Sequence, residues 1–60
     1  MSNYDLLKGI IDDLNDTIED YEDSRRMAIS NLDKYNYKVV IHELRRWKRS
    51  LETMLLELED

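Results

Sequence analysis

Large apolar side chains recur every three or four residues between Tyr37 and Leu58. This spacing places them on one stripe of a helix with 3.6 residues per turn, and neither Pro nor Gly interrupts the segment. We therefore predict a helix over residues 36–59. The side chains expected in its core are Leu44, Trp47, Leu51, Met54 and Leu58.

The first half of the chain carries a second stripe of similar length. Its steps alternate between three and four residues, which is the pattern of a heptad seam with Arg25 as one polar exception. The pattern predicts a helix over residues 3–30, capped at its start by Ser2 or Asn3. The side chains expected in its core are Leu7, Ile11, Leu14, Ile18 and Tyr21.

The two stripes do not form one continuous seam. An unbroken helix would place three polar side chains of the second half where apolar ones are needed. Asn31, Asp33 and Asn36 favour turns and caps, so we predict a turn over residues 31–36. In this interpretation Asn31 closes the first helix, and Asp33 or Asn36 begins the second. Two long helices with so short a link form an antiparallel hairpin, a single all-α domain over residues 1–60.

Both stripes are wider than one neighbouring helix can cover. A 60-residue chain also buries a small core, and the absence of Cys excludes disulfide support. These features predict that two hairpins pair into a homodimeric four-helix bundle. The ten core side chains named above are then the core of the oligomer.

Charge is separated into blocks along the chain, whose net charge is −5. Residues 1–24 carry eight acidic side chains against one lysine. Carboxylates that face one another four residues apart repel, and the sequence places no Lys or Arg within the run of residues 12–23 to offset them. One interpretation is a solvated face that keeps the protein soluble; another is a contact surface for a basic protein partner. The proposed acidic face comprises Asp12, Asp13, Asp16, Glu19, Asp20 and Asp23.

A basic patch follows in the second half, and its members are Arg45, Arg46, Lys48 and Arg49. Arg and Lys neutralise phosphates, so an RNA-binding hairpin dimer is an alternative function, and the layout resembles that of small helical-hairpin dimers that bind RNA. Trp47 lies on the apolar stripe, where core packing is expected rather than stacking on a base. The negative net charge also disfavours a phosphate backbone.

The composition argues against catalysis, cofactors and metal sites. His42 is the single histidine, and there is no Cys, so a Cys/His zinc site and a histidine-activated nucleophile are not expected. No apolar run exceeds three residues, which predicts neither a membrane span nor a secretion signal and favours the cytoplasm. We expect a small non-enzymatic regulator or inhibitor of bacterial or phage type that binds a protein partner through its acidic face. A structural assembly subunit is a further alternative.

Overall fold

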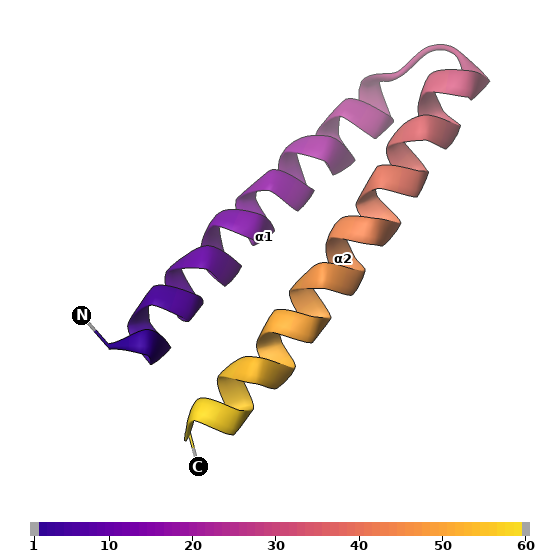
Figure 1. Cartoon of the computed structure of the whole chain (residues 1–60). Helices are drawn as coiled ribbons and strands as arrows, with labels where there is room; N and C mark the ends of the chain where they lie inside the picture. The colour runs from indigo at the N-terminus through magenta and orange to yellow at the C-terminus, as the bar shows by residue number, and fades with distance from the viewer. Residues whose placement is uncertain (1, 60) are drawn as a thin grey trace.

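The computed structural model describes residues 2–59 and consists of two antiparallel helices (Figure 1). Helix α1 spans Asn3–Met27 and helix α2 spans Asn31–Glu59. At the open end of the hairpin, the Tyr4 hydroxyl donates a hydrogen bond of 3.1 Å to the Glu59 carboxylate. The molecule is a single layer with extents of 45 × 17 × 10 Å. The all-helical hairpin predicted from the sequence is confirmed.

Both helices begin with the same capping arrangement. The Ser2 hydroxyl accepts a hydrogen bond of 3.1 Å from the Asp5 N–H, and the Ser30 hydroxyl accepts one of 3.0 Å from the Asp33 N–H. Each serine thus satisfies one of the backbone donors that the first helical turn leaves free. Asp5 and Asp33 also place a negative charge beside the positive end of the helix dipole. The repeated Ser-x-x-Asp pattern therefore sets where each helix starts.

The turn lies earlier in the chain than predicted. Residues 31–36 are helical, so the prediction of a turn there, with a C-cap at Asn31 and an N-cap at Asp33 or Asn36, is wrong. The link is residues 28–30, where Ala28 is extended and its N–H donates to the Arg25 carbonyl at 3.3 Å. Asn and Asp are poor helix formers in the interior of a helix. Because the Ser30 hydroxyl caps α2, residues 31–36 are instead the first turns of the helix, and a negatively charged Asp is favourable at a helix start.

Three isoleucines form the centre of the contact between the helices. Ile11 and Ile18 of α1 are each 6% exposed, and Ile41 of α2 is 3% exposed. Five of the predicted core residues are half-buried around them, namely Leu7, Leu14, Tyr21, Leu44 and Leu51. The Tyr21 and Tyr37 rings meet near the link at a centroid distance of 6.1 Å and a tilt of 56°. This contact follows the tilted geometry that aromatic pairs prefer.

Three other predicted core residues do not enter this seam. Trp47 is 61% exposed, Met54 52% and Leu58 48% in the single chain. The apolar stripe of α2 is wider than the surface that α1 alone can cover. The side of the stripe that contains Ile41 packs against α1, so the other side remains exposed in the single chain. Trp47, Met54 and Leu58 therefore stay a prediction for the core of an oligomer.

Gly9 lies inside α1 with open space around it. A Cβ built at this position meets nothing within 4 Å, and no residue that the structure describes has a positive φ. Gly9→Ala is therefore expected to raise the free energy of unfolding by about 1 kcal/mol, because Ala loses less backbone entropy in a helix. Thermal unfolding followed by circular dichroism measures this as an increase of about 4–8 °C in Tm. Gly9→Val should gain less, because a β-branched side chain loses rotamer freedom; an unchanged Tm for Gly9→Ala contradicts the expectation.

Candidate interaction surfaces

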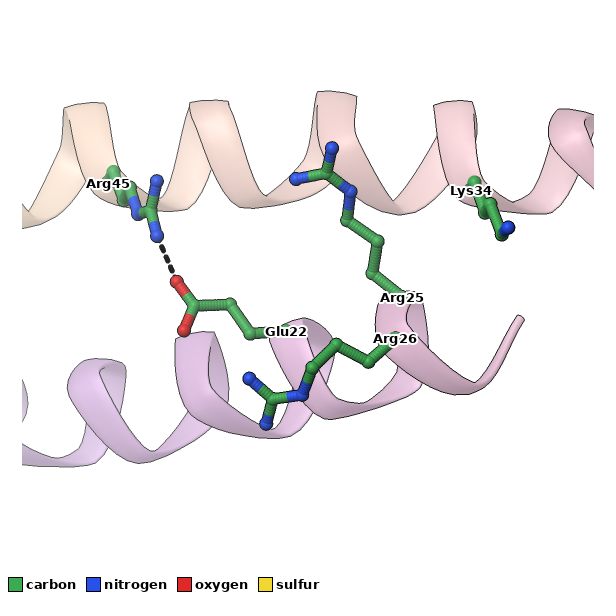
Figure 2. A pocket seen from close by; sticks show the side chains of 5 residues that line it. All are labelled: Glu22, Arg25, Arg26, Lys34 and Arg45. Atoms are coloured by element: carbon green, nitrogen blue, oxygen red, sulfur yellow. Dashed lines mark hydrogen bonds and ion pairs between the residues drawn. The ribbon is translucent and has the colours of Figure 1, made fainter.

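The seam between the helices divides the hairpin into two opposite faces. We assign Ile11, Ile18 and Ile41 to heptad position a. The residue before each a position is then g, and the residues three and four positions after each a position are d and e. In an antiparallel pair, the e positions of both helices line one side of the seam and the g positions line the other. An ion pair between Glu22 of α1 and Arg45 of α2, both at e, establishes this arrangement (Figure 2). The g positions therefore share the opposite face.

The g positions form an apolar face. Helix α2 contributes Val40, Trp47 and Met54, spaced seven residues apart and 37%, 61% and 52% exposed. Helix α1 contributes Ile10, which is 47% exposed, and the small side chains of Thr17 and Ser24. Leu6 and Leu58 extend this face toward the open end of the hairpin, and both are about half exposed. We define the apolar face as Leu6, Ile10, Val40, Trp47, Met54 and Leu58.

The opposite face carries two shallow hollows lined mainly by cationic side chains. The first, of about 450 Å³, lies next to the link and is lined by Glu22, Arg25, Arg26, Lys34 and Arg45. Figure 2 shows Arg25 reaching from α1 toward α2, while Arg45 reaches from α2 toward Glu22. The second, of about 400 Å³, is lined by His42, Arg45, Arg46 and Arg49. Arg45 belongs to both hollows, so they form one basic face.

The basic patch predicted from the sequence is therefore divided. Arg45, Arg46 and Arg49 lie on the basic face, whereas Lys48 is a half-buried seam residue at position a. The basic face also includes Arg25, Arg26 and Lys34, which are not among the residues predicted for the basic patch. Their place on this face could not be predicted from the sequence alone, because it depends on how α1 and α2 are aligned, which the ion pair between Glu22 and Arg45 shows.

The acidic residues predicted as a contact surface all lie on α1 and are exposed to solvent. Asp12 and Glu19 occupy one outer row, Asp16 and Asp23 the next, and Asp13 and Asp20 the row nearest the apolar face. Among the described residues, only Asp23 of these six takes part in an ion pair, which it forms with Arg26 three residues later. We call this surface the acidic edge.

One titratable group is perturbed at the open end of the hairpin. The hydrogen bond from Tyr4 to Glu59 and the negative charge of Glu59 raise the pKa of the Tyr4 phenol above its ordinary value of 10.0. The neutral phenol is the form that donates this bond, so the contact is present at neutral pH. This hydrogen bond links the two helix ends and involves no residue of the acidic edge.

Within residues 2–59, no group of three or more His, Cys, Asp or Glu side chains has the geometry to hold a metal ion. Over the same residues, neither helix combines the length and the apolar character that crossing a membrane requires. The surfaces with distinct chemistry are thus the apolar face, the basic face and the acidic edge. No protein-family model, curated protein or solved structure shows a significant match to this chain.

Proposed function

We propose that this chain is a non-enzymatic regulatory or inhibitory protein that acts as a homodimer and binds a basic surface of a protein partner through its acidic edge. The observation that carries the proposal is the separation of apolar and acidic side chains onto different surfaces of one hairpin. The apolar face supplies self-association, and the acidic edge stays accessible on the outside.

The exposed area supports the pairing of two copies. The chain exposes 5002 Å², whereas a compact monomer of its 7.3 kDa mass is expected to expose about 4200 Å². The excess of about 800 Å² matches the area that each partner buries in a protein interface of standard size. Packing the apolar faces of two hairpins together removes surface of this kind and produces a four-helix bundle.

The charges on the acidic edge support a basic partner. Asp12 with Asp16, Asp16 with Asp20, and Glu19 with Asp23 are like-charge pairs at four-residue spacing, each costing a helix about 0.2–0.5 kcal/mol. A neighbouring basic surface would turn this repulsion into attraction and would also accelerate association. The partner class implied by this chemistry is a protein that presents clustered Lys and Arg side chains.

The test of the acidic edge compares two variants with equal changes in charge. The variant Asp16→Asn, Glu19→Gln, Asp20→Asn is expected to weaken binding to a lysine- and arginine-rich peptide at least tenfold, because it removes three charges from the contact surface. Its own unfolding free energy should rise slightly, since the like-charge pairs are relieved. Fluorescence anisotropy of a labelled peptide measures the affinity.

The matched control for this comparison is Glu43→Gln, Glu52→Gln, Glu57→Gln, which removes three negative charges from α2 instead. This control variant should retain most of its affinity for the basic peptide. The small loss that comes from its changed net charge should disappear as salt is added. Equal losses in both triple variants would show that only total charge matters and would contradict the acidic edge as the contact surface.

The basic face favours a second candidate function, the binding of a nucleic acid. Nearly all the side chains that line its hollows are cationic or imidazole, and Glu22 is the one acid among them. Such a surface neutralises phosphates along a backbone, which gives affinity without base specificity. The side chains that line the basic face come from both helices, so this surface forms only when the hairpin is folded.

Arg45→Ala with Arg49→Ala is expected to weaken binding of a single-stranded RNA and to flatten its salt dependence by a slope of about 0.7 for each lost phosphate contact. A filter-binding titration from about 50 to 200 mM salt measures both quantities. Lys8→Ala serves as the control, because Lys8 lies near the open end, away from the hollows. Absence of binding by the unmodified protein at the lowest salt removes this function.

A further inference from the structure

We infer that the two copies pair in one particular orientation, in which α1 of each hairpin lies beside α2 of its partner and both links are at the same end of the bundle. This inference rests on the proposed homodimer and adds to it the identity of the neighbouring helices. Two independent properties of the apolar face, its surrounding charge and its side-chain volumes, favour this orientation.

Only two symmetric ways of stacking the apolar faces are available to a hairpin of this shape. A two-fold axis along the 45 Å dimension places α1 beside the partner's α2 and brings both links to one end. A two-fold axis across the helices, within the plane between the two layers, places α1 beside the partner's α1 and sends the links to opposite ends. The two orientations bury the same faces, so the neighbouring helices decide between them.

Charge disfavours the pairing of like helices. Residues 12–23 of α1 carry seven acidic side chains and no basic one. Helices that pack together lie about 8–10 Å apart, which is about one Debye length at physiological salt, so two such segments side by side would repel, and low salt would strengthen the repulsion. Pairing α1 with the partner's α2 avoids this contact.

The pairing within the hairpin shows what the acidic segment would meet instead. The hydrogen bond between Tyr4 and Glu59 places residues 12–23 level with about residues 40–51 of α2, and the long side chains of Glu22 and Arg45 reach along the helices to form their ion pair. Symmetry about the long axis places the partner's α2 at the same level. That segment contains four basic side chains and one acidic one. At this level α1 thus has its own α2 on one side and the partner's α2 on the other, and both segments carry net positive charge, although Arg45, Arg46 and Arg49 lie on the basic face, which turns away from the partner copy.

Side-chain volumes lead to the same orientation. At two of the three levels of g positions, α1 has a small side chain and α2 a larger one, namely Thr17 with Trp47 and Ser24 with Val40; at the third level Ile10 lies opposite Met54. Protein cores reach their usual density when large groups pack against small ones. Placing α1 beside the partner's α2 provides this match. Pairing like helices would bring two Trp47 side chains together near the middle of the bundle and leave the small residues facing each other.

The orientation also sets how a partner protein would meet the dimer. The two α1 helices then occupy diagonally opposite corners of the bundle. Asp12, Asp16, Glu19 and Asp23 point away from the partner copy and stay exposed at each corner. Each dimer accordingly presents two separate acidic edges and would bind two copies of a basic protein.

A single cysteine at the link distinguishes the orientations. The chain has no Cys, and Ile29 is 95% exposed, so a spin label on Ile29→Cys neither competes with another thiol nor disturbs the seam. The inferred orientation predicts a spin–spin separation of about 15–30 Å, the diagonal of a four-helix bundle plus the arms of the labels. The alternative orientation predicts a separation near the 45 Å length of the hairpin.

Pulsed dipolar spectroscopy measures the separation, and sedimentation equilibrium on the same labelled sample measures the oligomeric state. A dimer with the short separation supports the inference. A dimer with the long separation overturns the orientation while keeping the homodimer, and a monomer at every concentration overturns both. Ile29→Ser, examined by sedimentation alone, checks that a substitution in the link leaves the association unchanged.

Discussion

Trp47→Glu is expected to raise the dissociation constant of the proposed homodimer about a thousandfold. Trp47 is at the middle of the apolar face and is 61% exposed in the single chain. A buried interface Trp commonly contributes 2 kcal/mol or more, and symmetry removes two copies at once, so the loss is about 4 kcal/mol. The new carboxylates would also have to enter an apolar core without partners.

Leu56→Glu is the matched control for this prediction. Leu56 is 62% exposed, almost the same as Trp47, but it lies on the opposite side of α2 at the border of the basic face. Both variants exchange an exposed apolar residue for a carboxylate, so they differ in location and not in type of change. Sedimentation equilibrium should show weakened association for Trp47→Glu alone; equal association of both variants would remove the apolar face as the dimer interface.

The single Trp offers a second readout in the unmodified protein. Its emission should shift to shorter wavelength as the concentration rises, because the proposed dimerisation would transfer the indole from water to an apolar core. The thermal midpoint of unfolding should rise over the same protein concentrations, because only folded chains associate with one another. An emission maximum and a midpoint that are both independent of concentration would indicate a stable monomer.

The helices and their antiparallel pairing were predictable from the sequence because apolar spacing depends on local geometry alone. The stripes around Ile11 and Ile41 repeat at helical period, and neither helix contains Pro. The position of the link was less accessible, because Asn31 and Asp33 favour turns as isolated residues. The Ser30 hydroxyl changes that preference, and a Ser-x-x-Asp pattern identical to the one at Ser2 was present as a signal.

The surfaces could be predicted only in part, for a different reason. Membership of the acidic edge follows from α1 alone, since Asp16 and Asp20 are on the outer side of any helix that buries Ile11 and Ile18. The basic face depends on which residues of α2 lie level with α1, and that alignment is set by long-range contacts such as Glu22 with Arg45. The wide apolar stripe of α2 does not reveal which of its two sides packs against α1. The apolar stripe therefore predicts Trp47 in the same seam as Ile41, whereas in the structure Ile41 is buried against α1 and Trp47 is exposed beside it.

Ile41→Ala is expected to lower the free energy of unfolding by about 2–5 kcal/mol. Ile41 is 3% exposed, the lowest value among the buried residues, and it packs against α1 at the centre of the seam. Truncation loses the burial of three carbon atoms and leaves a cavity that the surrounding helices fill only partly. A 60-residue chain is expected to have a total stability of about 3–9 kcal/mol, so this loss is a large fraction of it.

Urea unfolding followed by circular dichroism measures the change as a lower midpoint with a similar slope. The comparison variant is Val39→Ala, two residues away on the same helix, where the side chain is 44% exposed and faces outward. That change should alter the stability by less than about 1 kcal/mol, because Ala gains helix propensity while little buried area is lost. If the two variants unfold at the same urea concentration, then Ile41 does not occupy the centre of the core, and the alignment of the helices that defines the apolar and basic faces is incorrect.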